Sequence, residues 1–264
     1  MKPTRASQIL QGFPSECPPS SLVDTNGDKV LAIRAKSLFE DVCSLIQPSS
    51  ILEIGSWMGS SSISWKAASE KYRQGAIVYC IDTWLGSPEH YLSTAGNEWN
   101  IEKLSITDKG PTFFEEFLRN IHSSGYGKCI LPMRADSYSA LKYLALQNAM
   151  FDIIYIDGAH DEISVFRDVT LAFGLLTEGG VICGDDFGWQ SVKTALFLSS
   201  FDKATPKFNT LVKDGDFILV NTNNVKVIEF LVSKGYSNWN SFAQAYVALR
   251  FMAKKLFFGC LKLF

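Results

Sequence analysis

Residues 51–61 read Ile51-Leu52-Glu53-Ile54-Gly55-Ser56-Trp57-Met58-Gly59-Ser60-Ser61. An apolar run of strand length ends at Gly55, and a segment with a helical pattern follows Gly59. The two glycines permit a tight turn and allow a ligand to approach the backbone closely. A strand, a glycine loop and a helix in this order predict an open parallel sheet that binds its ligand beyond the strand ends.

Strands and helices alternate along the rest of the chain. Strands are predicted at 50–54, 76–81, 128–133, 151–156 and 180–184, and helices at 28–47, 60–71, 112–121, 137–147, 162–176 and 189–199. Because these strands are apolar on both faces, they predict a parallel sheet that is covered on each side and joined by right-handed crossovers.

The last part of this pattern differs, because two short apolar runs at 210–212 and 216–220 flank the turn Lys213-Asp214-Gly215. That arrangement predicts an antiparallel hairpin. The expected fold class is therefore α/β: a Rossmann-like, mostly parallel sheet with helices on both faces and a C-terminal antiparallel hairpin.

Three parts are expected along the chain. An N-terminal arm and helix occupy residues 1–47, and the main domain occupies 48–222, with an insertion or lid at 83–110. A helical extension at 223–264 ends in a basic amphipathic tail. Such a tail either binds a membrane or partner, or docks as a terminal helix on its own domain or on a twin subunit. The sequence leaves the oligomeric state open, and a homodimer is the commonest oligomer in general.

Composition narrows the class of protein. Of the 264 residues, 47% are hydrophobic and 20% charged, and the net charge is −2, which predicts a globular protein that does not bind nucleic acid. The six cysteines form no Cys-x-x-Cys pair, which favours buried thiols in a reducing compartment. The polar N-terminus does not resemble a signal peptide, and no apolar stretch is long enough to span a bilayer. We therefore expect a cytoplasmic protein without a transmembrane segment.

The glycine loop after the first predicted strand distinguishes between two kinds of ligand that the protein could bind. A dinucleotide-binding enzyme needs Gly-x-Gly-x-x-Gly so that pyrophosphate reaches the helix end. Here the loop is Gly-x-x-x-Gly, with Trp57 and Met58 where that approach would occur. The loop thus favours a ligand without pyrophosphate, and the structural alternative is a tight strand–helix turn.

Two further strand ends carry polar residues. Asp82 ends the second strand, where an acid can accept hydrogen bonds from both ribose hydroxyls, or else cap a helix. After the third strand, Asp136 and Ser137 either reach an adenine edge or cap the helix that follows.

Three acids follow the fourth and fifth strands: Asp157, Asp185 and Asp186. Carboxylates that converge repel one another unless a cation or protons compensate. Oxygen ligands favour Mg²⁺, or else Ca²⁺ or Mn²⁺, over zinc. The alternative for Asp185 and Asp186 is a strand-end turn without metal.

His160 lies three residues after Asp157, at the start of a helix. An imidazole there can take a hydroxyl proton as general base. Alternatively, His160 or Asp161 caps the helix.

Together these motifs resemble the class I S-adenosylmethionine-dependent methyltransferases. More narrowly, they resemble metal-dependent O-methyltransferases, including bacterial sugar- and macrolide-tailoring enzymes. The similarity covers about residues 50–190. It rests on Glu53-x-Gly55-x-x-x-Gly59, Asp82, Ile156-Asp157-Gly158-Ala159-His160 and Gly179-Gly180-Val181-Ile182-Cys183-Gly184-Asp185-Asp186.

The resemblance implies S-adenosylmethionine as cofactor. Glu53, Gly55 and Gly59 would line its methionine end, Asp82 would hold the ribose, and Asp136 and Ser137 would flank the adenine. Further cofactor contacts are expected from Ser56, Ser60, Thr83, Trp84 and Asp157.

At the reaction end, the resemblance implies Mg²⁺ held by Asp157, Asp185 and Asp186, with His160 and Asp157 as the catalytic pair. The expected acceptor is a hydroxyl of a sugar or small molecule, selected by the arm and the insertion. Three alternatives remain: an NAD-dependent oxidoreductase on the same fold, a nucleic-acid methyltransferase, and a non-catalytic nucleoside-binding module.

Overall fold

The computed structural model describes residues 36–87, 90–91, 106–107, 110–239 and 249. Its main sheet has eight strands: β1 (Ser50–Ile54), β2 (Ile77–Asp82), β5 (Ile130–Arg134), β6 (Phe151–Ile156), β7 (Leu176–Gly184), β8 (Phe208–Lys213), β9 (Asp216–Asn221) and β10 (Ser237–Asn238). A separate two-stranded pair consists of β3 (Ile106–Thr107) and β4 (Gly110–Pro111).

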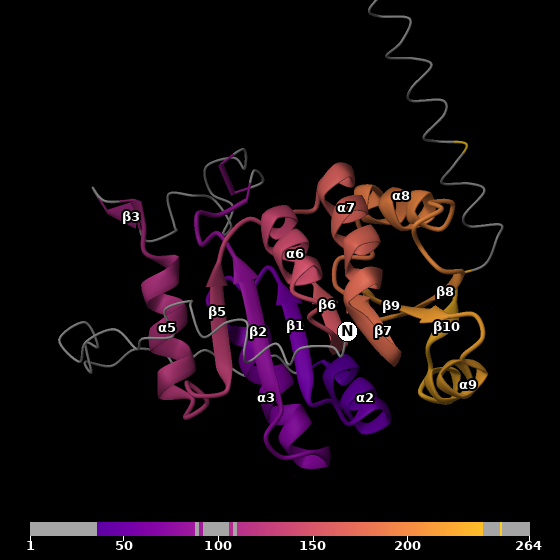
Figure 1. Ribbon diagram of the computed structural model, residues 1–264, viewed down its shortest axis with the longest axis horizontal. Coiled ribbons are helices and arrows are strands. Elements are labelled where there is room, and N and C mark those ends of the chain that lie inside the picture. The colour runs from indigo at the N-terminus through magenta and orange to yellow at the C-terminus, as the bar shows by residue number, and fades with distance from the viewer. Residues whose placement is uncertain (1–35, 88–89, 92–105, 108–109, 240–248, 250–264) are drawn as a thin grey trace, which may run out of the picture.

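The order of strands across the main sheet is β10-β8-β9-β7-β6-β1-β2-β5 (Figure 1). The five strands from β5 to β7 are parallel, whereas β9 pairs antiparallel with both β7 and β8. From β1 the chain continues outward to β2 and β5, and then returns to β6 and β7 on the other side of β1. The order reverses between β1 and β6, and open α/β sheets bind ligands at such a point.

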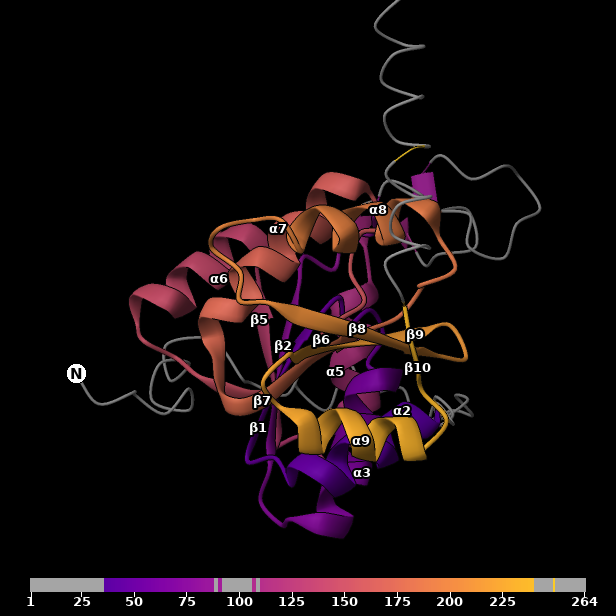
Figure 2. The same cartoon turned by 90° about the vertical axis from the view of Figure 1, so that its right-hand side faces the viewer.

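Helices form a layer on each face of the sheet, as Figure 2 shows. On one face lie α2 (Ser37–Ile46), α3 (Ser60–Tyr72), α5 (Phe113–Ser123) and α9 (Val225–Ser233). On the other face lie α6 (Ser137–Leu146), α7 (Glu162–Ala172) and α8 (Gln190–Ser199). Each layer buries its own apolar cluster against the sheet. The α/β fold class predicted from the sequence is confirmed.

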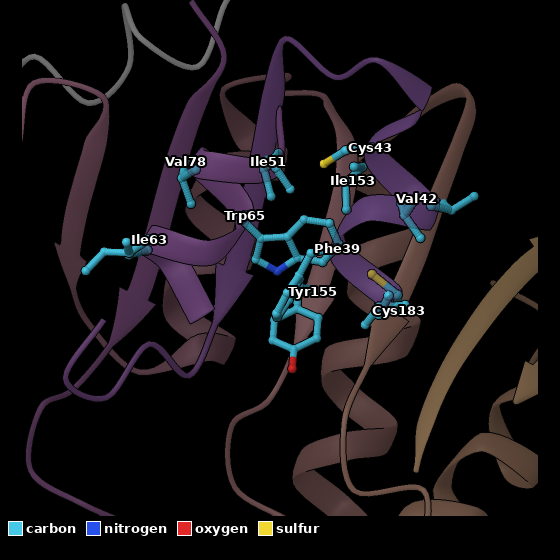
Figure 3. Packing of buried hydrophobic residues seen from close by; sticks show 14 of the residues in the cluster. Phe39, Val42, Cys43, Ile51, Ile63, Trp65, Val78, Ile153, Tyr155 and Cys183 are labelled. Carbon is cyan, nitrogen blue, oxygen red and sulfur yellow. The ribbon is translucent and has the colours of Figure 1, made fainter. Parts of the chain in front are cut away.

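The aromatic side chains of Phe39, Trp65 and Tyr155 pack together in the core beneath α2 and α3 (Figure 3). The ring of Trp65 packs edge-on against Phe39 and Tyr155, with centroids 4.7 and 5.5 Å away. The hydroxyl of Tyr155 donates a hydrogen bond of 3.3 Å to Asp157 Oδ2. This core therefore supports the loop that follows β6.

The antiparallel hairpin is confirmed, with β8 and β9 joined at Asp214 and Gly215. Both turn residues have positive φ, 51° and 89°, as a two-residue turn of type I′ requires. The helix expected at 162–176 instead ends at Ala172, followed by a 3₁₀ turn, η4 (Phe173–Leu175). β7 consequently starts at Leu176, which pairs with Phe151 through an irregular register.

Several sequence predictions concern residues that the structure does not describe. The arm at 1–35, most of the insertion, and the tail at 240–264 apart from Leu249 lie outside the described residues. In the extension expected to be helical, the described residues form α9 and then β10, which pairs with β8. Among the described residues, no helix has the length and apolar character needed to cross a membrane.

Candidate active site

The loop after β1 lies against the backbone of the neighbouring β6 loop. Gly55 has a φ of +86°, and its N–H donates to Ile81 O at 2.8 Å. A Cβ at Gly55 would lie 2.1 Å from the carbonyl oxygen of Asp157. Glycine is therefore required here by the contact between two strand-end loops, as well as by the turn itself.

The carboxylate of Asp82 holds this glycine loop. Its Oδ2 accepts the backbone N–H groups of Ser56 and Trp57, at 2.9 and 2.8 Å. Its Oδ1 accepts the N–H of Trp84 at 2.7 Å. Because a carboxylate oxygen accepts two hydrogen bonds, Oδ1 retains capacity for a ligand hydroxyl. Asp82 thus stabilises the glycine loop, and its Oδ1 can accept one further hydrogen bond, as the predicted contact with a ribose hydroxyl requires.

Glu53, predicted at the methionine end, is fully buried under the start of α3. Its Oε2 accepts a hydrogen bond from the Ser62 hydroxyl. Burial raises the pKa of Glu53 to about 6, against the opposing effect of the Ser61, Ser62 and Ser56 hydroxyls. The contacts of this buried side chain support the glycine loop from beneath.

The loop after β5 carries a helix cap. Asp136 is the N-cap of α6 and accepts the Ser139 N–H at 3.0 Å, which is the capping alternative considered for this residue. Ser137 hydrogen-bonds Asp168, a carboxylate of α7 that is 2% exposed. Burial raises the pKa of Asp168 to about 7, while the Ser137 hydroxyl opposes the rise.

The raised pKa of Asp168 makes stability depend on pH. Between about pH 4 and pH 7 the folded protein keeps a proton that the unfolded chain has lost, so stability falls as pH rises. From pH 5 to pH 8, we expect wild type to lose about 2–3 kcal/mol relative to Asp168→Asn. Urea unfolding at both pH values measures this, with Asp214→Asn in an exposed turn as control. An equal loss in wild type and Asp168→Asn contradicts it.

Three predicted residues come together at the ends of β6 and β7. His160 Nε2 lies 2.7 Å from Asp186 Oδ2 and 3.9 Å from Asp157 Oδ1. One ligand atom from each of the three lies within 4.8 Å of the others. Asp161, and not His160, caps α7, by accepting the N–H groups of Ile163 and Ser164. His160 is therefore at the site and not occupied as a helix cap.

Asp185 lies beside this cluster but is paired elsewhere. Its Oδ2 is 2.6 Å from Lys36 Nζ, which also contacts Asp216 Oδ1 at 2.7 Å. Burial raises the pKa of Asp216 to about 6, Lys36 lowers it, and Asp185 adds to the rise. The three acids predicted as a set are thus divided: Asp157 and Asp186 face His160, and Asp185 faces Lys36.

Aromatic rings cover the glycine loop. The ring of Trp57 stacks on His90 and on Phe113, each with centroids 4.5 Å apart. Trp57 has a φ of +46°, and its carbonyl accepts the Trp84 Nε1–H at 2.7 Å. Trp84 is 1% exposed, so this predicted cofactor residue lies within the wall of the site and its indole is not at the surface.

The other predicted cofactor positions lie nearby. Gly59 is the N-cap of α3 with a φ of +92°, and Ser60 is its first residue. Thr83 directly follows β2 and accepts the Leu85 N–H through its hydroxyl.

Sequence reasoning missed three residues at this site: Lys36, Asp216 and Trp189. Lys36 precedes α2, and its partner Asp216 lies 180 positions away, a separation that no local pattern signals. Trp189 stacks on His160, with centroids 5.1 Å apart. Its position three residues after Asp186 was the one available sequence signal.

A family model described as a methyltransferase domain matches residues 52–187, just over half of the chain. No match was found among the curated proteins. Similar solved structures include an O-methyltransferase from Bacillus cereus in complex with S-adenosylhomocysteine, at 16% identity and a TM-score of 0.48, covering 73% of this chain and 84% of that one. An O-methyltransferase of tomaymycin synthesis from Streptomyces achromogenes has 18% identity and a TM-score of 0.49, covering 72% and 82%.

Proposed function

Because the chain belongs to the methyltransferase-domain family, we propose that it transfers a methyl group from S-adenosylmethionine to a hydroxyl of a small molecule or sugar. The methyltransferase family predicted from the sequence is confirmed by this membership, and the oxidoreductase alternative is not favoured. The observation that supports O-methylation is the meeting of Asp157, His160 and Asp186 beside the glycine loop.

The proposed cofactor site follows the strand ends. The glycine loop from Gly55 to Gly59 would take the methionine part, with Glu53 supporting it from below. The free acceptor capacity of Asp82 Oδ1 suits a ribose hydroxyl. Asp136 and Ser137 begin α6 next to Asp82 in the sheet order, on the side proposed for adenine.

The donors at the reaction end fit a divalent cation. Asp157 and Asp186 offer carboxylate oxygens, the ligands of Mg²⁺ and Mn²⁺, and the imidazole of His160 is also accepted by Mn²⁺. We propose Asp157 and Asp186 as the metal-holding residues, with Asp185 joining them only when it leaves Lys36. A bound cation would orient the acceptor hydroxyl and lower its pKa.

The chain's own residues then perform two tasks. The glycine loop and the rings of Trp57 and Phe113 would hold the methyl donor in line with the acceptor, and positioning of this kind is worth roughly 7–11 kcal/mol. His160 would take the hydroxyl proton. S-adenosylmethionine would supply the methyl group: the acceptor oxygen would bond the methyl carbon as the carbon–sulfur bond breaks, and the electron pair of that bond would stay on the sulfur of S-adenosylhomocysteine.

Calorimetric titration tests the proposed cofactor. We expect S-adenosylmethionine to bind with a Kd of about 1–100 μM and NADH not to bind, because the loop lacks the pyrophosphate-binding glycines. Binding of NADH alone would overturn the proposed function. Binding of S-adenosylmethionine justifies screening hydroxylated acceptors in the presence of Mg²⁺ or Mn²⁺.

The metal site is tested by Asp→Asn variants at its three acids. Asp157→Asn and Asp186→Asn are each expected to weaken Mn²⁺ binding by about tenfold or more, because each removes a charged ligand. Asp185→Asn is the matched variant and is expected to weaken it less, since that carboxylate is bound to Lys36. Mn²⁺ relaxation enhancement of water measures the affinities. The largest loss at Asp185→Asn would contradict the assignment.

A further inference from the structure

Trp189 combines exposure with a fixed place at the reaction end. Its side chain is 48% exposed, although it stacks on His160 with centroids 5.1 Å and planes 30° apart. Its open part therefore adjoins the group proposed to take the acceptor's proton.

The turn Asp186-Phe187-Gly188-Trp189 fixes this arrangement. The Trp189 N–H donates to the Asp186 carbonyl at 2.9 Å, and Asp186 has a φ of +58°. The Phe187 N–H donates to Gly215 O at 2.8 Å, which ties the turn to the β8–β9 hairpin. Two residues of this turn contact the His160 imidazole. Asp186 Oδ2 lies close to its Nε2, and the Trp189 ring stacks on its face.

The position of Trp189 is also fixed by the helix that follows, because Trp189 is the N-cap residue of α8. The first turns of that helix bury Val192, Ala195 and Leu196 against the sheet. The exposed indole is thus presented by a packed helix, as a precise binding group requires.

We propose that Trp189 is the stacking surface of the acceptor site and takes the apolar face of the ring that carries the methylated hydroxyl. This inference rests on the proposed function. The acids offer only polar contacts, so a ring that turns its hydroxyl edge toward them needs an apolar surface for its face, and the part of the indole that His160 leaves exposed offers one. Phenolic rings and pyranose sugars share this chemistry, an apolar face next to hydroxyls.

Two ring probes and two matched variants test this inference. Saturation-transfer NMR measures binding of catechol and of methyl β-glucopyranoside to the full chain with S-adenosylhomocysteine and Mg²⁺. Trp189→Ala is expected to weaken at least one ring probe about tenfold, and Trp189→Phe to restore most of the affinity. Phe201→Ala, just after the other end of α8 and 70% exposed, is expected to change neither.

The outcomes separate this inference from the proposed function. If S-adenosylhomocysteine binds all variants equally and only Trp189→Ala weakens a ring probe, the inference stands, and the probe that responds names the ring class. If S-adenosylhomocysteine binds but Trp189→Ala affects neither probe, or affects both no more than Phe201→Ala does, the inference is wrong and the methyltransferase assignment is untouched. Failure of wild type to bind S-adenosylhomocysteine counts against the proposed function.

Discussion

Replacing Gly55 with alanine is expected to destabilise the protein by more than about 3 kcal/mol and to abolish binding of S-adenosylmethionine. The added Cβ would lie 2.1 Å from the Asp157 carbonyl oxygen, and backbone cannot rotate away as a side chain does. The φ of +86° adds about 1 kcal/mol of strain for any residue with a Cβ. Both loops would have to separate, and these loops form the proposed cofactor and acid sites. Urea unfolding and calorimetric titration measure the two effects.

Gly179→Ala is the matched control for this change. Gly179 has almost the same φ, +83°, but a Cβ there would meet no atom within 4 Å. We expect it to cost about 1 kcal/mol, the backbone strain alone, and to leave cofactor binding intact. Equal costs at both glycines would show that the Gly55 contact with Asp157 contributes nothing.

Replacing His160 with asparagine is expected to lower kcat by about 10²–10⁴-fold, because the described residues of the cluster include no second imidazole that could take the proton. Affinity for S-adenosylmethionine should stay within about twofold of wild type, since His160 lies on the acceptor side. Single-turnover methyl transfer to an accepted hydroxyl compound measures the chemical step, and calorimetry measures the cofactor affinity.

His122→Asn, at an exposed position in the last turn of α5, controls for the loss of a histidine and should leave kcat unchanged. Metal affinity supplies the decisive comparison. If His160→Asn weakens Mn²⁺ binding as strongly as it lowers kcat, His160 is a metal ligand and its assignment as general base is wrong.

Most of the fold was predictable because its signals are local. The buried strands are apolar on both faces, and the turn Asp214-Gly215 has residues that tolerate positive φ, so strand type and hairpin follow from short stretches. The boundary between α7 and β7, near residues 172–180, was harder to predict from the sequence. Gly179 and Gly180 look like a break, yet β7 runs through them because Leu176 pairs with Phe151.

The candidate site was predictable only in part. Asp157, His160 and Asp186 follow strand ends, and parallel neighbours place such ends together. Asp185 differs from Asp186 by one position, and the sequence gives both the same expectation. Asp186 has a positive φ and its carboxylate lies next to His160, whereas the carboxylate of Asp185 forms an ion pair with Lys36.

Local pattern thus determined the strands, the glycine loop and the kinds of residue at each strand end, since these depend on neighbours within a few positions. The tertiary structure decided which of those residues meet. It buried Glu53 and Trp84, brought Lys36 to Asp185 and Asp216, and set Trp189 on the face of His160. Such contacts depend on packing between segments that are separate in the chain, and a lysine carries no local mark of partners more than a hundred residues away.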